Sequence, residues 1–415
     1  MSIKSLDLSK NNLLSCVRNK LIVNGQGIIF FKNENNECEC MLFIYNKYHN
    51  DGLKVEFLHD ELVVTRISNN NKLVDINNSK GLSYKKGAYY WFSLDAQNQR
   101  LYAGIGEARL DNVIYKYDLS HDFKLFLESL TEIKVSEESK YIKLIKLLRD
   151  PITMNVPLLV KDTHELTMVD IAKGDYLPKA NLSLVSQKLY DCISGKKFIL
   201  DDSDFPDFSK AIEYSIKTPG LWCNTKLKDK STEFNKDKPN ILETYLRITL
   251  GENNGESPGI PYVMEIWPVG HYSPVHSHGN SNAIIRVLHG KIHVKLFPFL
   301  CEDGHNIEPF AEKIFSKNDI TWISPTLNQV HQLVNDKENR DTCITIQCYM
   351  YDNENTTHYD YFDYIDGDGK VEQYEPDSDM DFIQFRETIM GEWNNRQNNI
   401  KKNILKFDKM LCGTV

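Results

Sequence analysis

Short runs of alternating apolar and polar residues dominate the chain from about residue 21 to residue 117. The runs are rich in β-branched and aromatic side chains, and polar turns such as NG, HNDG and SNNN separate them. They are LIVNGQGIIFF, CMLFIYNKY, LKVEFL, ELVVTRI, AYYWFSLDA, QRLYAGIG and NVIYKYDL. Short strands separated by polar turns are typical of a β-sandwich or jelly roll. We therefore expect residues 1–120 to form a β-sandwich domain.

Four consecutive aromatic residues, Tyr89, Tyr90, Trp91 and Phe92, belong to one of these runs. Adjacent rings can form a platform on which a sugar stacks, but more often they fill a hydrophobic core. If the rings are exposed, a sugar or a protein could be the partner of this domain.

Helical periodicity replaces the alternation in residues 121–223. Apolar residues recur every three or four positions at residues 121–130, 137–149, 182–193 and 206–216, which predicts four helices. Ser136 can cap the second helix, and glycines at 195 and 220 follow the third and fourth. The charged stretch 224–240 contains few apolar residues, so we predict a surface linker there.

A second series of strand-like runs extends from residue 241 to residue 352. They are ILETYLRITLG, YVMEIWPVG, AIIRVLHGKIHVKLFPF, ITWISP, VHQLVND and TCITIQCYMYD. Their turns predict a second β-sandwich or small barrel, which we place at residues 224–376.

Helical spacing returns at the end of the chain, in residues 377–415. Its apolar positions are Phe382, Phe385, Ile389 and Trp393 and, after a polar interruption, Ile400, Ile404 and Leu411. This pattern predicts one long or two short helices that pack on the barrel or on another subunit. The expected fold class is therefore mainly β with helical segments.

Charge and composition exclude several classes of function. The 49 basic and 58 acidic residues give a net charge of −9 without a basic cluster, which argues against a nucleic-acid partner. There is no run of about 18 apolar residues and no leader-like start, so we expect a cytoplasmic protein without a membrane partner. The nine cysteines are an odd number with no C-x-x-C pair, which favours free thiols.

Three histidines show a spacing that suits a metal ion. His276 and His278 are two residues apart, so on an extended chain both imidazoles project from the same face. His331 follows 53 residues later, at the start of another predicted strand. Imidazole binds Fe(II), Zn, Cu and Ni, so the ligand type does not identify the ion. The remaining histidines of this region lack such spacing and are expected to be packed or surface residues.

These positions resemble the two motifs of the cupin superfamily, G-x5-H-x-H-x3,4-E-x6-G and P-x-G-x2-H-x3-N. In this chain the first motif reads Gly270, His276, His278, Ala283 and Gly290, and the second reads Pro325, His331 and Asn335. Ala283 stands where the family has a glutamate ligand, and the spacing from Pro325 to His331 is six residues rather than five. Three neutral imidazoles without a carboxylate are similar to the site of thiol dioxygenases, the cysteine dioxygenase family. The resemblance covers about residues 243–351.

The resemblance implies a double-stranded β-helix and a role for each matching residue. His276, His278 and His331 would hold Fe(II), although another divalent metal such as Ni or Zn would also suit them. Arg247 would pair with a substrate carboxylate, with Tyr245 on the same strand face. Tyr349 would be the active-site tyrosine, and Gln347 stands where the family has a histidine. Glutamine can hydrogen-bond Tyr349 but cannot accept its proton.

The implied activity is the oxidation of a small carboxylate-bearing thiol, such as cysteine, by O2 to a sulfinate. The alternative is a catalytically altered or inactive cupin with a structural or binding role, in which the N-terminal β-sandwich is the interaction surface.

Overall fold

The computed structural model divides the chain into two compact units, Met1–Val156 with Phe297–Ala311, and Pro157–Leu296 with Glu312–Val415. It describes residues 19–33, 40–58, 61–77, 88–136, 139, 141–153, 155–235, 237–250, 262–279, 281–300, 307–351 and 361–412. The first residues of the chain, on which the expectation of no leader rests, lie outside these ranges.

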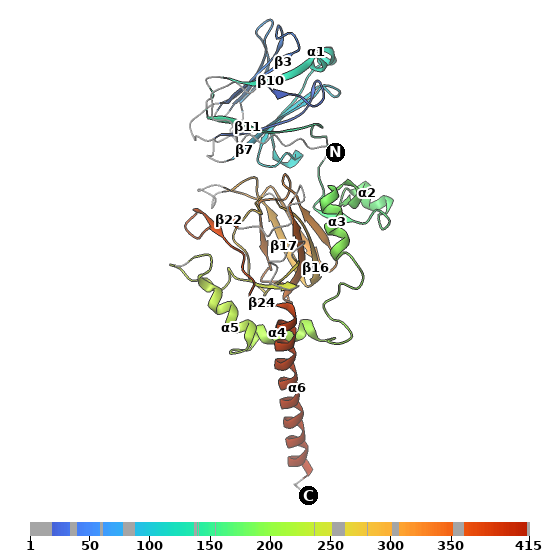
Figure 1. Ribbon diagram of the computed structural model, residues 1–415, viewed down its shortest axis with the longest axis vertical. Coiled ribbons are helices and arrows are strands. Elements are labelled where there is room, and N and C mark those ends of the chain that lie inside the picture. The colour runs from blue at the N-terminus through green and yellow to red at the C-terminus, as the bar shows by residue number, and fades with distance from the viewer. Residues whose placement is uncertain are drawn as a thin grey trace. The chain divides into compact units, whose positions relative to one another are not determined.

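The first unit is a sandwich of two antiparallel sheets (Figure 1). In spatial order, one sheet contains β1 (Asn19–Lys20), β10 (Leu130–Val135), β3 (Cys40–Asn46), β4 (Gly52–Phe57), β5 (Glu61–Arg66) and β6 (Asn71–Asn77). The other contains β11 (Ile142–Leu148), β2 (Gln26–Asn33), β7 (Tyr89–Asp95), β8 (Arg100–Ile105) and β9 (Val113–Asp118). Both sheets contribute alternate side chains, such as Ile44 and Phe31, to one buried core. The predicted β-sandwich is confirmed.

The aromatic run of β7 belongs mainly to the interior of this unit. Tyr90, Trp91 and Phe92 are buried, and only Tyr89 is exposed, at 40%. The run therefore fills the core and does not offer a row of rings for stacking. Whether the first unit has a sugar or protein partner stays a prediction.

The predicted helix at residues 137–149 is wrong, because Ile142–Leu148 forms β11. Its sequence, IKLIKLL, fits helical and strand spacing equally well, and pairing with β2 decides between them. The helix expected at 121–130 is present as the 3-10 turn η2 (His121–Phe123) and α1 (Lys124–Glu128), and β10 follows at once. The β-sandwich consequently continues past residue 120, through β10 and β11.

The second unit also contains two facing layers of strands. In spatial order, its large sheet contains β13 (Tyr176–Pro178), β12 (Leu159–Lys161), β19 (Ile320–Ile323), β16 (Asn282–His289), β21 (Cys343–Met350), β15 (Tyr262–Trp267), β14 (Leu246–Leu250) and β24 (Met380–Asp381). The other layer contains β18 (Ala311–Ser316), β17 (Lys291–Leu296) and β20 (His331–Val334), and the hairpin of β22 (Phe362–Ile365) and β23 (Val371–Tyr374). The predicted second β-domain is confirmed, and the molecule is mainly β.

Helices flank the strands of the second unit, and most of the last one extends away from them (Figure 1). They are α2 (Met168–Lys173), α3 (Leu184–Ile193), α4 (Phe208–Lys217), α5 (Trp222–Asp229) and α6 (Phe382–Cys412), with 3-10 turns η3 (Lys179–Asn181) and η4 (Lys230–Thr232); η1 (Leu110–Asn112) lies in the first unit. The helices predicted at 182–193 and 206–216 are confirmed as α3 and α4, and the C-terminal segment forms one long helix. No helix among the described residues has both the length and the apolar character to cross a bilayer.

The linker predicted at 224–240 is wrong, because α5 and η4 occupy its first half. Cys223, Leu227 and Phe234 are buried there. On one face of a helix only every third or fourth residue has to be apolar, so a few apolar side chains are enough to pack α5 against the rest of the unit. Most charged side chains of the segment are at least partly exposed, although Lys230 is buried, and this high charge obscured the apolar spacing.

Arg286 on β16 holds the end of α3 against the large sheet. Its Nη1 donates to the carbonyl oxygens of Ile193 at 2.8 Å and Gly195 at 3.0 Å, and its Nη2 donates to Oδ1 of Asn318 at 3.0 Å. The last carbonyls of a helix have no donors within the helix, and the helix dipole favours a cation beside them. Arg286 satisfies both conditions from a buried position.

Replacing Arg286 by methionine is expected to destabilise the second unit by about 2 kcal/mol, because the buried carbonyl group of Ile193 loses its side-chain donor. Urea unfolding followed by circular dichroism measures this as a lower midpoint. Lys210→Met is the control, because Lys210 forms an exposed ion pair with Asp207 on α4, and its midpoint should equal that of the wild type. Equal midpoints for all three proteins would contradict the role of Arg286.

Candidate metal centre

The segment that carries His276 and His278 leaves β15 through a turn at Gly270. Gly270 has a φ of 82°, a left-handed conformation that glycine adopts without strain. The segment then lies antiparallel to the start of β20: the backbone N–H of His276 donates to the oxygen of His331, and that of His331 to the oxygen of His276, both at 3.0 Å. Residues that face each other in this way have adjacent side chains. Main-chain pairing therefore brings the third histidine beside the other two.

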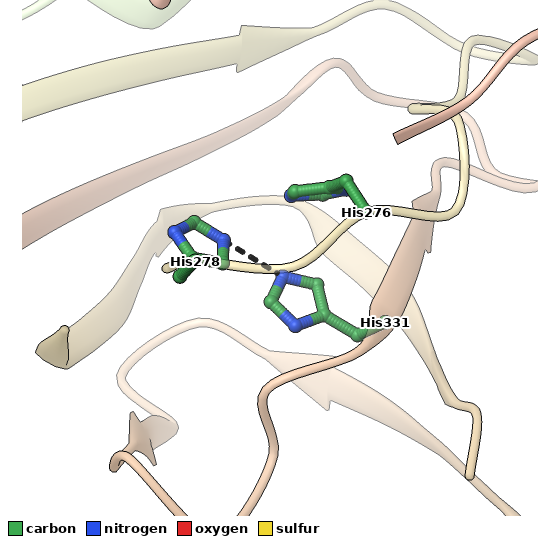
Figure 2. Close-up of side chains that lie close together, drawn as sticks. All are labelled: His276, His278 and His331. Carbon is green, nitrogen blue, oxygen red and sulfur yellow. Dashed lines mark hydrogen bonds between the residues drawn. The ribbon is translucent and has the colours of Figure 1, made fainter. Parts of the chain in front are cut away.

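The three imidazoles converge on one point inside the second unit (Figure 2). One ring nitrogen from each lies within 4.8 Å of the others, and Nε2 of His278 is 3.2 Å from Nε2 of His331. All three side chains are buried. Among the described residues, they form a group that could hold a metal ion.

Hydrogen bonds to backbone oxygens orient two of these rings. Nδ1 of His276 lies 3.0 Å from the oxygen of Pro274, and Nδ1 of His331 lies 3.0 Å from the oxygen of Asn328. A ring that donates from Nδ1 keeps the Nε2 lone pair for a ligand, the usual arrangement at metal sites. Nδ1 of His278 is buried and has no hydrogen-bond partner. This donor set fits a divalent metal, for which neutral imidazoles are common ligands.

The protein interior keeps these histidines uncharged. The pKa of His276 is lowered to about 4, mainly by burial and to a smaller extent by the charge of Arg247, while the hydrogen bond to the oxygen of Pro274 acts in the opposite direction. Burial also lowers the pKa of His331 to about 3, with a smaller effect from His276. The pKa of His278 is lowered well below its ordinary value, first by burial and then by the charges of His331, His276 and Arg247. At neutral pH each ring is therefore a neutral imidazole, the form in which histidine binds a metal.

No carboxylate takes part in this group among the described residues. Ala283, at the position where the cupin motif has its glutamate, is buried on β16 directly opposite Tyr349 on β21. A metal held here by the protein would have three neutral ligands and would keep its full positive charge.

A cavity between the two layers of strands adjoins the histidines. Its wall is mostly apolar and includes Ile285, Val287, Ile292, Val294, Leu296 and Phe315. Glu265, Thr345 and Gln347 of the large sheet line the cavity, together with His276 and His278 from the segment after β15 and His331 from β20. A small molecule in this cavity would lie beside the imidazoles and would be largely shielded from water.

A row of buried polar groups crosses three strands beside the cavity. Arg247 on β14 is directly opposite Glu265 on β15, with Nη1 3.5 Å from Oε1, and both side chains are buried. Gln347 on β21 donates from Nε2 to Oε2 of Glu265 and accepts the hydroxyl proton of Tyr349 on Oε1. The hydrogen bond expected between Gln347 and Tyr349 is therefore present.

Glu265 is a member of this site that the sequence analysis missed. The available signal was its place in the strand YVMEIW, where every other side chain is apolar or aromatic, so that either face would bury the carboxylate. The pKa of Glu265 is raised by burial, and the charge of Arg247, the hydrogen bond from Gln347 and the charge of Lys230 offset only part of this shift. Because Glu265 already provides an anionic partner for the guanidinium of Arg247, a substrate carboxylate would have to compete with Glu265 for that arginine.

The other predicted residues also lie near the histidines. The ring of Tyr245 stacks on Trp267 with centroids 4.1 Å apart, and both rings line the cavity. The ring of Tyr349 stacks on that of His278 at 5.6 Å. Arg247 does not line the cavity itself, although its charge affects His276 and His278. The structure thus brings all seven predicted site residues into one region.

Comparison with known proteins adds little to this picture. No family model matches the sequence. Similar solved structures include the cupin domain of Cnp3 from Schizosaccharomyces pombe, which is 14% identical with a TM-score of 0.20 over 26% of this chain and 65% of that one. A cupin 2 domain-containing protein from Halorhodospira halophila is 16% identical, with a TM-score of 0.21 over 33% of this chain and 73% of the other.

The DMSP lyase DddQ from Ruegeria pomeroyi is 18% identical, with a TM-score of 0.20 over 26% of this chain and 48% of the other. The chain thus spans less than two thirds of the Cnp3 cupin domain and about half of the lyase. None of these three proteins is described as a thiol dioxygenase. Likenesses this weak do not assign a function.

Proposed function

We propose that the second unit is a metal-dependent enzyme of the cupin type, and that it oxidises a small thiol to a sulfinate with O2. The observation that carries the proposal is the group of three buried histidines, which contains no carboxylate among the residues that the structure describes. A divalent ion with three neutral ligands keeps its charge, and such a charge favours the thiolate over the thiol. Fe(II) is the proposed ion, and Ni or Zn would suit the same ligands.

The overall reaction balances without a further reductant. The thiol loses its proton, both atoms of O2 end on sulfur, and sulfur loses four electrons to the oxygen atoms as the thiol becomes a sulfinate. The chain's own residues position the reactants and exclude water. The apolar wall of the cavity shields the site, and the stacked rings of Tyr349 and His278 fix each other's orientation.

The expected role of Arg247 as an anchor for a substrate carboxylate meets an obstacle. Arg247 is paired with Glu265 in the interior, so a substrate carboxylate would have to compete with Glu265. Gln347 cannot act as a base, and it links Tyr349 to Glu265 through hydrogen bonds. We therefore propose a small thiol as the substrate and do not require it to carry a carboxylate.

Metal analysis and oxygen uptake test the proposal. Protein purified without a histidine tag is expected to contain about one iron per chain and to consume O2 only when a thiol is added. Cysteine, cysteamine and 3-mercaptopropionate cover the common small thiols. Protein that stays free of metal after incubation with Fe(II), Ni(II) and Zn(II) would overturn the metal site, and iron-loaded protein without thiol-dependent uptake would overturn the dioxygenase.

The second candidate is a cupin without this activity, which serves as a binding or structural protein. The observation that favours it is the closed polar row, in which Arg247, Glu265, Gln347 and Tyr349 bind one another. In this case the first unit would be the interaction surface. The candidate predicts no oxygen uptake with any thiol, and it fails if uptake is found.

A further inference from the structure

We infer that Glu265 determines which ligands the cavity accepts: it binds small molecules that present an ammonium or amide N–H group, and it excludes those that present a carboxylate. The inference rests on the proposed function, because it names the substrate class of the same cavity. The expectation based on Arg247 was a ligand with a negatively charged carboxylate, whereas Glu265 favours a ligand with a positively charged or N–H-bearing group.

The first argument is the position of the two charges. Glu265 lines the cavity, whereas Arg247, which shares its face of the sheet, does not. A ligand that enters the cavity therefore meets the carboxylate of the pair. A second carboxylate beside Glu265 would be repelled, and in a buried site this repulsion is strong because little water screens it.

The second argument is that the neighbours of Glu265 suit an ionised carboxylate. Tyr349 donates its hydroxyl proton to Oε1 of Gln347, so the amide of Gln347 presents its NH2 group to Oε2 of Glu265. Oε1 of Glu265 faces the guanidinium of Arg247, which has donors only. Both oxygens therefore face donors, and this is the arrangement of an ionised carboxylate.

The third argument is that Glu265 has acceptor capacity left for a ligand. An ionised carboxylate offers about four lone-pair sites. Gln347 occupies one on Oε2, and Oε1 is 3.5 Å from Nη1 of Arg247, an ion-pair distance longer than an ordinary hydrogen bond. An N–H group of a ligand can thus be added without displacing Arg247. A ligand carboxylate would instead have to take Arg247 away from Glu265.

Two pairs of small ligands separate the charge preference from the thiol chemistry. Cysteamine and 3-mercaptopropionate share a thiol on a two-carbon spacer and differ in the group at the other end. Propylamine and propionate carry the same two end groups without a thiol. Isothermal titration calorimetry on the full chain, with and without Fe(II) under anaerobic conditions, measures binding without any turnover.

The wild type is expected to bind cysteamine at least about tenfold more tightly than 3-mercaptopropionate. It should likewise bind propylamine more tightly than propionate. Glu265→Gln removes the charge but keeps the shape and an acceptor, so both ratios should fall toward one. Glu312→Gln is the matched control, because Glu312 is a partly exposed carboxylate on β18 that pairs with His293, and both ratios should stay at the wild-type values.

Tighter or equal binding of either carboxylate ligand by the wild type would overturn the inference, and so would the absence of binding by all four ligands. An unchanged ratio in folded Glu265→Gln would overturn the role of Glu265. If that variant does not fold, the wild-type ratios still decide the preference. Thiol-dependent oxygen uptake that favours 3-mercaptopropionate would refute the inference alone, whereas an intact amine preference without oxygen uptake would refute the proposed function alone.

Discussion

Replacement of His278 by alanine is expected to abolish metal binding, with the metal content falling from about one ion per chain to a few per cent. Of the three histidines, His278 is the one whose Nδ1 has no hydrogen-bond partner. Its replacement therefore breaks no hydrogen bond to the backbone and should disturb the fold least. Changes to groups that merely orient a metal ligand weaken binding by about 10–100-fold, and loss of one of three direct ligands should weaken it further. Inductively coupled plasma mass spectrometry of dialysed protein gives the metal content.

His293→Ala is the matched control for this experiment. His293 lies on β17 of the same unit, where it contacts Glu312 and Asp336 at the surface and takes no part in the group of three. It should keep the wild-type metal content. The metal site is wrong if His278→Ala binds as much metal as His293→Ala, provided that both variants give the circular dichroism spectrum of the wild type.

Replacement of Arg247 by methionine is expected to destabilise the second unit by about 3–5 kcal/mol, because it leaves the buried carboxylate of Glu265 without its ionic partner. The double variant Arg247→Met/Glu265→Gln removes both charges and keeps an acceptor for Gln347, so much of the lost stability should return. Urea unfolding of the two single variants and the double variant completes a thermodynamic cycle. Additive effects in this cycle would contradict the ion pair.

The same variant should show a stronger pH dependence of stability than the wild type. Burial raises the pKa of Glu265 and Arg247 opposes this shift, so removal of Arg247 raises the pKa further. A carboxyl whose pKa is higher in the folded state stabilises the fold below its unfolded pKa, and this contribution is lost as the pH rises through the folded pKa. The stability deficit of Arg247→Met should therefore be smaller at pH 5 than at pH 8. A constant deficit would mean that Glu265 is not the group left unpaired.

Local sequence was enough to predict most strands and the helices with clear stop signals. Alternation located β2 to β5 and β7 to β9 in the first unit, and periodicity ending at glycines located α3 and α4. It failed where one pattern fits two structures. The sequence of β11 suits a helix as well as a strand, and the charged surface of α5 conceals the few side chains that dock it.

The same division applies to the candidate site. The spacing of His276 and His278, together with the position of His331 at the start of a predicted strand, pointed to one cluster, and the cluster is present. The sequence also placed Arg247 on the same strand face as Tyr245. It did not indicate what Arg247 faces, because its partner belongs to another strand.

The sequence by itself therefore determined the β-rich class of the protein, its main strands and the three histidines of the candidate metal site. The class and the strands depend on residues a few positions apart, and the histidines were identified from their spacing and from the resemblance to the two cupin motifs. Only the tertiary structure decided that Arg247 pairs with Glu265 and that Glu265 joins Gln347 and Tyr349. Those contacts follow from the register of β14, β15 and β21, and a strand's register depends on the whole sheet and not on its own sequence. The charge that a ligand meets in the cavity is a consequence of that register.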